Sequence, residues 1–421
     1  MTDKEVKEAA KAIAAKLKPV VPEAPAKPQI VLTPSQQEVV ASLLKWYKDP
    51  KRWPYITVAG YAGTGKTTTI AIWRNEFARE NAKAKVAFAS YTGKAAQVLQ
   101  QKLQNLQAVF PGDNVSTIHG LIYNPEVNSR DEIIGWKRKE TLPYSMIVID
   151  EASMIHKGLW NDLLQYKVPI IAVGDHGQLP PVGEQSFSLL TNPNLELKDI
   201  LRQELDNPIL ALATSIRETG TLEIGRYGDR TRVMDLANPE SQELMWDLLG
   251  NFNDDTLLLC GFNHTRVKLN NQIRGIREYY SPQPERGERV ICLRNNHAKG
   301  IYNGMLGKIE SIENAEEPNM SDWYRAGINF ADYNTDYHGL IYKPQFGALA
   351  AQNFSEDRNK TMAGDLFDFG YALTVHKAQG SEAERVIVIA ERSQHMDDDT
   401  WKRWLYTGVT RAQRELYVFK R

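Results

Sequence analysis

The residues that most directly predict chemistry lie in a glycine-rich segment, Gly60-Tyr-Ala-Gly-Thr-Gly-Lys-Thr67. Glycines let backbone N–H groups wrap around phosphates without Cβ clashes, and a lysine at this spacing reaches the β- and γ-phosphates. The segment follows an apolar run at 55–59 and opens a helical stretch, whose N-terminus favours an anion. The sequence therefore predicts a nucleotide site. Its predicted contacts are Gly60, Gly63, Thr64, Gly65, Lys66, Thr67 and Thr68.

Two carboxylates, Asp150 and Glu151, end a second apolar run. Such a pair supplies an aspartate that binds Mg²⁺ together with Thr67, and a glutamate that polarises the attacking water. Paired acids after a strand are also common as helix caps, but the glycine-rich loop favours the catalytic interpretation. A third apolar run leads to Gln178, which either senses the γ-phosphate or lies in a surface turn.

Short β-branched runs that alternate with helical stretches must position these side chains. The first series of predicted strands covers 55–59, 85–90, 146–149 and 169–173, and the second covers 256–260, 385–390 and 415–419. Two α/β units with parallel sheets are the simplest architecture for this order. A segment at 287–336, rich in Gly and Asn, predicts a small β insertion in the second unit.

Composition excludes several classes of protein. The 421 residues are 42% hydrophobic and 24% charged, and no apolar run approaches the ~20 residues of a membrane span. With two cysteines and a start that does not resemble a secretory signal, we expect no disulfide framework and a location in the cytoplasm. Nine Lys/Arg against three Asp/Glu at 266–308 suit a bound polyanion, although ordinary solvated surface is an equal alternative.

Several further segments resemble the motifs of superfamily 1 helicases. Asp150-Glu-Ala-Ser153 and Gly174-Asp-x-x-Gln178-Leu-Pro-Pro181 resemble motifs II and III. The run from Thr374 to Glu382 is similar to motif V, and Leu405-Tyr-Thr-Gly-Val-Thr-Arg-Ala412 is similar to motif VI. Together with the glycine-rich loop, these motifs stand in the order of the family.

The branch within the superfamily is indicated by two finer resemblances. Leu32-Thr33-x-x-Gln36 resembles the Q motif, which recognises adenine. Gly287-Glu-Arg-Val290, with Asn303-Gly304 and Gly307, resembles an SH3-like insertion. The set is most similar to the RecD- and Dda-type branch, and closest to the Dda helicases of phages.

The resemblance implies roles for two arginines in ATP hydrolysis. Motif VI supplies a charge to the departing γ-phosphate, which assigns this role to Arg411, and a motif IV arginine corresponds to Arg202. Either arginine is alternatively a surface ion-pair residue. Because these arginines lie on the second unit and the glycine-rich loop on the first, hydrolysis would be coupled to closure of the cleft between them.

The resemblance also implies that single-stranded DNA lies across both units. Motifs Ia, Ib and V place Thr92, His119, Thr374 and His376 on this path, where hydroxyls and imidazoles bind phosphates without reading bases. Both histidines are equally plausible as buried core residues. The segment 121–143 matches a pin that wedges the duplex, and Trp136 either stacks on the first base pair or pins the hairpin to its neighbour.

The implied function is an ATP-dependent DNA helicase that uses Mg²⁺, moves 5′→3′ on single strands and unwinds 5′-tailed duplexes. Alternatives are a P-loop kinase or ATPase that does not act on nucleic acid, and a non-catalytic DNA-binding module. We expect a monomer in the cytoplasm of a bacterium or a phage-infected host, with no membrane contact. The N-terminal helix and Pro-rich linker at 1–28 either dock a protein partner or form a loosely held extension.

The resemblance divides the remaining chain into four predicted domains. RecA-like domain 1A covers 29–120 and 144–197, and the pin domain 1B covers 121–143. RecA-like domain 2A covers 198–285 and 366–421, and the SH3-like domain 2B covers 286–365.

Overall fold

The computed structural model describes residues 31–127, 133–180, 187–201, 206–296, 299–316, 320–331, 335–352 and 363–421. Contacts between Cα atoms divide the chain into two compact units, residues 1–33 and 34–421, and the description below concerns the second unit. Within the described part of the chain, no helix is both long enough and apolar enough to cross a membrane. The four-domain division of the sequence stays a prediction.

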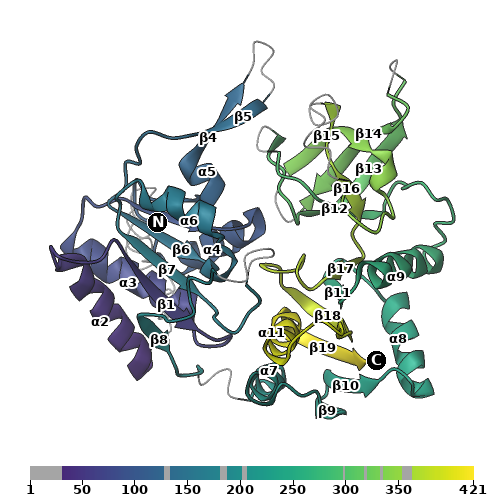
Figure 1. Ribbon diagram of the computed structural model, residues 1–421, viewed down its shortest axis with the longest axis horizontal. Helices are drawn as coiled ribbons and strands as arrows, with labels where there is room; N and C mark the ends of the chain where they lie inside the picture. Colours follow the sequence, from purple (N-terminus) through teal and green to yellow (C-terminus); the bar gives the residue numbers. More distant parts are fainter. Residues whose placement is uncertain are drawn as a thin grey trace, which may run out of the picture. The chain divides into compact units, whose positions relative to one another are not determined.

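The first sheet has six parallel strands in the order β3-β2-β6-β7-β1-β8 (Figure 1). They are β1 (Tyr55–Gly60), β2 (Val86–Ser90), β3 (Asn114–Thr117), β6 (Met146–Asp150), β7 (Ile170–Gly174) and β8 (Leu195–Leu197). The central strands are buried along almost their whole length, which explains their continuous apolar sequences. The predicted strands of this series are confirmed, with ends that shift by about one residue.

One helix precedes the first strand of this sheet, and four others follow strands along the chain. They are α2 (Pro34–Lys48), α3 (Lys66–Glu80), α4 (Gly93–Asn105), α5 (Ile118–Ile122) and α6 (Lys157–Leu164). Since β1, β6 and β7 are parallel, their carboxyl ends meet at one edge of the sheet. The glycine-rich loop, the acid pair and the loop with Gln178 follow these three ends, so the topology brings them together.

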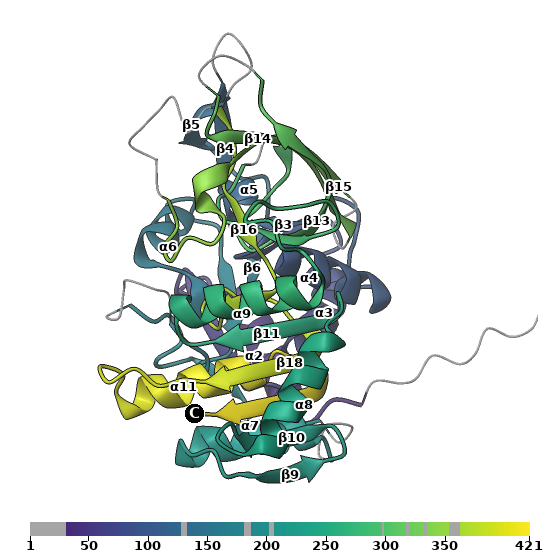
Figure 2. The ribbon, with the colours of Figure 1, turned by 90° about the vertical axis from the view of Figure 1, so that its right-hand side faces the viewer.

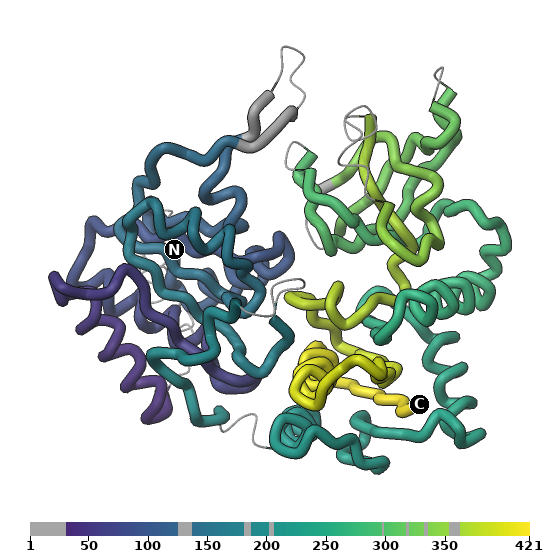
Figure 3. Tube along the Cα trace, viewed as in Figure 1, coloured from purple at the N-terminus to yellow at the C-terminus, as the bar shows by residue number. Residues whose placement is uncertain are grey.

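The second sheet has the order β17-β11-β18-β19-β10-β9, and only the edge pair β9–β10 is antiparallel. Its strands are β9 (Gly225–Gly228), β10 (Thr231–Asp235), β11 (Thr256–Cys260), β17 (Ala372–Thr374), β18 (Ala383–Ala390) and β19 (Ala412–Lys420). Figure 2 shows β11, β18, β10 and β9 one above the other. The chain supplies β9 to β11 first and returns with β17 to β19 after a long excursion (Figure 3).

Alternate residues of the second sheet pack against different helices. Leu257 and Val388 share a core with α7 (Pro208–Thr219) and α11 (Asp398–Val409). Leu258 and Ile387 share another core with α8 (Pro239–Gly250) and α9 (Asn263–Ile276). Side chains alternate between the two faces of each strand, so helices cover both faces of this sheet, as the α/β prediction requires.

The excursion forms a five-stranded antiparallel sheet in the order β15-β14-β13-β12-β16, which we call the β insert. Its strands are β12 (Arg289–Cys292), β13 (Leu306–Asn314), β14 (Trp323–Phe330), β15 (Thr335–Tyr342) and β16 (Phe367–Phe369). The last strand, β16, lies beyond the predicted boundary at 365; it pairs with β12 and forms one edge of the sheet. The likeness to an SH3 domain stays a prediction.

A hairpin of β4 (Tyr123–Val127) and β5 (Ile133–Arg138) extends from the first sheet (Figure 1). It begins two residues after the predicted start of the pin at 121. Leu121 and Ile122 belong to α5 and are buried in the core of the first sheet, so they cannot be part of a projecting wedge.

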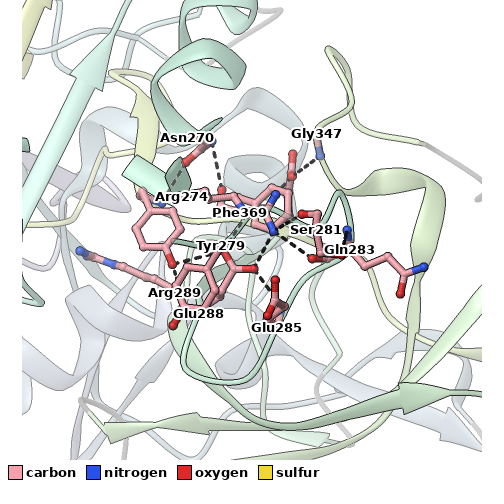
Figure 4. Close-up of polar contacts among 12 residues, drawn as sticks. Asn270, Arg274, Tyr279, Ser281, Gln283, Glu285, Glu288, Arg289, Gly347 and Phe369 are labelled. Carbon is pink, nitrogen blue, oxygen red and sulfur yellow. Dashed lines mark hydrogen bonds and ion pairs between the residues drawn. The ribbon is translucent and has the colours of Figure 1, made fainter. Parts of the chain in front are cut away.

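The β insert joins the second sheet through a buried polar network (Figure 4). The Arg274 guanidinium on α9 donates to both carboxylate oxygens of Glu288, at 2.7 and 3.0 Å, and to the carbonyls of Ser281 and Gln283. It also lies over the Phe369 ring, 4.2 Å from the centroid. Glu288 begins the insert and Phe369 ends it, so one arginine holds both connections of the insert.

Candidate nucleotide cleft and nucleic-acid groove

The glycine-rich loop joins the end of β1 to the first residue of α3. Gly63 and Gly65 have φ values of 79° and 74°, a left-handed conformation that only glycine adopts readily. A Cβ at Gly60 would lie 2.6 Å from the Thr64 hydroxyl. These positions require glycine, and together they curl the loop so that its amides can surround an anion.

Lys66 is held inside the curl of this loop. Its Nζ donates to the carbonyls of Gly60 and Tyr61, at 2.8 and 3.1 Å, and lies 4.0 Å from the Asp175 carboxylate. Gln36 supports the outside of the loop, since its Nε2 donates to the Thr64 carbonyl at 3.0 Å. The loop therefore presents a fixed positive charge at the start of α3, where Thr67 and Thr68 lie half-buried.

The acid pair lies beside this charge. The Thr67 hydroxyl is 3.3 Å from the Asp150 carboxylate, a hydroxyl and carboxylate pair of the kind that binds Mg²⁺ next to phosphates. Burial and the neighbouring Asp150 charge raise the pKa of Glu151, against the opposing effect of Arg411 and Lys66. Among the described residues, Glu151 Oε2 has no hydrogen-bond partner although it is buried. That oxygen is available to orient a water.

Arg411 reaches the cleft from the second sheet. It is 3% exposed, and its guanidinium donates to the carbonyls of Thr407 and Ser381. Its charge lowers the pKa of both Glu151 and Glu382, so it lies within electrostatic reach of the acid pair. The second predicted arginine, Arg202, lies outside the described residues.

The loop after β7 connects the two sheets. Gln178 is 5% exposed; its Nε2 donates to Asp175 at 3.5 Å, and its Oε1 has no partner among the described residues. The next amide, of Leu179, donates to the Thr407 hydroxyl on α11 at 3.0 Å, and the Leu179 carbonyl accepts from Gln379. Gln178 is therefore not in a free surface turn.

Sequence reasoning missed several residues of the cleft. The hydroxyl of Tyr406 accepts from the Ala62 amide and donates to Asp175. The Arg217 guanidinium lies 3.8 Å from the centre of the Tyr61 ring. Tyr61, Arg217 and Tyr406 line a cavity of about 180 Å³ beside the glycine-rich loop. The position of Tyr406 within motif VI was the only available signal.

A larger groove of about 750 Å³ runs between the first sheet, the second sheet and the β insert. The predicted DNA contacts Thr92, His119, Thr374 and His376 all line it. Burial lowers the pKa of both histidines, with a further contribution from His156 at His119, which favours neutral imidazoles. The backbone of Trp136 is in β5, but its side chain lies outside what the structure describes.

The basic segment at 266–308 is partly buried, although Lys268, Arg277, Arg286 and Lys308 are exposed. Arg266, Arg274 and Arg289 are at most 9% exposed. Arg266 and Arg274 pair with Asp368 and Glu288, and Lys299 pairs with Asp365. These paired cations hold the β insert in place, and Arg266 also lines the groove described above.

Comparisons with known proteins match the regions that form the first and second sheets. Residues 31–238 match the AAA domain family, and residues 369–419 match the UvrD-like helicase C-terminal domain. The chain is 26% identical over 380 residues to the ATP-dependent RecD2 DNA helicase of Deinococcus radiodurans, covering 85% of this chain and 46% of that protein. It is 26% identical over 399 residues to the RecBCD enzyme subunit RecD of Mycolicibacterium smegmatis, covering 86% and 67%.

Solved structures show the same fold. A structure of two coordinating Pif1 helicases at forked double-stranded DNA has a TM-score of 0.53 at 18% identity, and Bacteroides Pif1 with ADP-AlF3 and single-stranded DNA has a TM-score of 0.52 at 18%. Each alignment covers 92% of both chains. These solved structures support the fold, and the sequence matches are to RecD-type proteins. The chain spans about half the length of the RecD2 protein, and a special likeness to phage Dda helicases stays a prediction.

Proposed function

We propose that this chain is a superfamily 1 helicase of the RecD-like and Pif1-like type: an enzyme that hydrolyses ATP to move 5′→3′ along single-stranded DNA and to unwind duplex DNA. The observation that carries the proposal is that two sites share the same two sheets. The nucleotide cleft combines Lys66 and Glu151 with Arg411, and the groove combines Thr92 with Thr374. A change in the cleft therefore moves the walls of the groove.

The cleft has a residue for each requirement of phosphoryl transfer. Lys66 neutralises the β- and γ-phosphates, and Glu151 orients the attacking water through its unpaired oxygen. Arg411 stabilises charge on the γ-phosphate as the bond breaks. Gln178 lies between Asp175 and α11, where it can report the γ-phosphate to the second sheet. Thr67 and Asp150 would hold Mg²⁺, which supplies further neutralisation of phosphate charge when bound.

The groove suits a nucleic-acid backbone of any sequence. Thr92 caps α4, so its hydroxyl lies at the start of a helix whose amides favour phosphate oxygens. Neutral histidines and hydroxyls bind phosphates without selecting bases, as a translocating protein requires. The direction of movement, the recognition of adenine by Gln36 and the role of Arg202 rest on the resemblance.

Unwinding assays with matched tails test the proposal. We expect ATP-dependent unwinding of a 5′-tailed DNA duplex and little or none of a 3′-tailed or RNA duplex, with ATP hydrolysis stimulated by single-stranded DNA. Hydrolysis without any DNA stimulation would favour a kinase or an unrelated ATPase. DNA binding without hydrolysis would favour a non-catalytic module, and preference for 3′ tails would overturn the assigned branch.

The hairpin gives a separate test of duplex separation. Replacing 124–137 with a short Gly-Ser turn removes the projecting strands but keeps Ile122 and Lys139, whose carbonyls accept from the Tyr166 hydroxyl. We expect DNA-stimulated hydrolysis and single-strand translocation to persist while unwinding falls, because nothing then blocks the displaced strand. Undiminished unwinding would remove the wedge assignment without affecting the proposal of a DNA-dependent motor.

A further inference from the structure

The hydroxyl of Tyr406 makes a direct connection from the second sheet to the nucleotide-binding loop. Tyr406 is on α11 and is 2% exposed. Its hydroxyl accepts from the Ala62 amide at 2.9 Å and donates to the Asp175 carboxylate at 2.8 Å. Asp175 is fully buried and also lies 4.0 Å from Lys66 Nζ. One hydroxyl thus joins a loop amide to the carboxylate beside the phosphate-binding lysine.

The same tyrosine is linked to Arg411, which lies just beyond the C-terminal end of α11. The Thr410 hydroxyl donates to the Tyr406 carbonyl at 2.8 Å, and the Arg411 guanidinium contacts that Thr410 hydroxyl at 3.3 Å. Arg411 also donates to the carbonyl of Thr407, the residue that follows Tyr406. Because these bonds hold the end of α11 as one rigid segment, the position of Tyr406 against the loop determines the position of Arg411 relative to Glu151.

An ordinary buried tyrosine offers a contrast within the same chain. Tyr337 in the β insert is 1% exposed, and its hydroxyl donates to the Leu340 carbonyl three residues away and lies beside the Asp365 carboxylate. The hydrogen-bond partners of Tyr406 are Asp175 and Ala62, which are 231 and 344 residues away and lie in loops that follow strands of the first sheet. Burial and Asp175 raise the pKa of Tyr406 well above its ordinary value, so its hydroxyl stays protonated and able to donate.

We propose that Tyr406 is a positioning residue that registers Arg411 against the nucleotide-binding loop through the Ala62 amide and Asp175. Phosphates that bind the loop amides change the hydrogen bonding of Ala62, and α11 transmits this change to Arg411 and to the second sheet. The inference rests on the proposed ATP-hydrolysing function, and it adds a contact between the sheets that does not itself touch the reacting atoms.

Replacing Tyr406 with Phe tests the hydroxyl while keeping the packing of the ring. We expect Tyr406→Phe to lower kcat by roughly tenfold to a hundredfold, because a small misplacement of a catalytic group costs that much. KM for ATP should stay within about threefold, since the loop and Lys66 are intact. Stimulation of hydrolysis by single-stranded DNA should fall, whereas DNA affinity measured without nucleotide should not change.

Two further variants distinguish positioning from general stability. Tyr337→Phe also loses a buried hydroxyl, so we expect a similar loss in melting temperature but a parental kcat. Adding Tyr406→Phe to Arg411→Ala should lower kcat no further, because the arginine that Tyr406 positions is already absent. A parental kcat and DNA stimulation in Tyr406→Phe, or multiplying effects in the double variant, would overturn the inference. A parent chain that hydrolyses no ATP would instead refute the proposed function.

Discussion

The nucleotide cleft and the junction of the β insert both bury charged side chains, but they differ in how these charges are satisfied. At the junction, Glu288 accepts two bonds from Arg274 and another from the Glu285 amide. In the cleft, buried oxygens of Glu151 and Gln178 have no partner among the described residues, and Arg411 donates to carbonyl and hydroxyl oxygens instead of a carboxylate.

The difference separates a structural network from a site prepared for a ligand. Buried polar groups are nearly always hydrogen-bonded, so an unpaired one calls for an explanation, and beside a phosphate-binding loop a ligand or a water provides it. A saturated network fixes one arrangement and contributes rigidity. We infer that the junction keeps the β insert attached to the second sheet as one body, while the cleft accepts new partners and changes.

The largest expected effect is in the cleft. Lys66→Ala should abolish ATP hydrolysis, because it removes the charge that neutralises the β- and γ-phosphates. The fold should survive, since Lys66 Nζ bonds two carbonyls of its own loop and no buried carboxylate closer than 4.0 Å. Phosphate release measures turnover, and thermal unfolding serves as the control. Substantial turnover in this variant would show that the loop is not the nucleotide site.

Arg411→Ala should cut kcat by on the order of a thousandfold, as the loss of an arginine finger does. Nucleotide affinity should stay within about tenfold, because the arginine acts mainly on charge that develops during the reaction. Steady-state kinetics and equilibrium binding of a labelled nucleotide separate the two effects. If nucleotide affinity were lost while kcat remained, Arg411 would bind the nucleotide in the ground state. Closure of the cleft would then not explain its role.

Glu151→Gln should retain ATP binding and lose turnover by on the order of a hundredfold to a thousandfold, since an amide orients water poorly and cannot accept its proton. Its folded stability should not fall, because the carboxylate that it replaces is buried without a full set of partners. Single-turnover hydrolysis compared with nucleotide binding measures both. Normal turnover would mean that another acid orients the water.

The same substitution at the junction should have the opposite result. Glu288→Gln leaves the buried Arg274 charge unpaired, which we expect to lower the free energy of unfolding by about 3 kcal/mol. Because Glu288 is outside the cleft, the variant that remains folded should hydrolyse ATP with a parental kcat. Urea denaturation at neutral pH provides the measurement. If Glu151→Gln and Glu288→Gln were equally stable, the cleft and the junction would not differ in how their buried charges are satisfied.

Local sequence signals predicted the cleft much better than the junction. The glycine-rich loop and the acid pair stand in consecutive residues, so the sequence alone could predict that Lys66 and Glu151 belong to one cleft; their catalytic roles stay predictions. The junction and Tyr406 depend on contacts between distant elements, such as the bond from Ala62 to a residue 344 positions away. The composition of 266–308 was misleading for the same reason: a count of charges does not show that Arg274 faces Glu288.

The smallest expected effect is the contribution of Glu151 to the pH dependence of folding stability. Burial and the Asp150 charge raise the pKa of Glu151 in the folded state. Below the ordinary glutamate pKa of about 4.3, both states are protonated and the residue costs nothing. As pH rises toward the folded-state pKa, the unfolded chain releases its proton first, so the folded state progressively loses stability, and the loss is complete above that pKa.

Glutamine does not titrate. The stability of Glu151→Gln relative to the parent should therefore grow with pH through this window and then level off, when both are unfolded in urea without nucleotide or Mg²⁺. A difference that stays constant with pH would mean that the buried carboxylate is already satisfied, and the cleft would then resemble the junction.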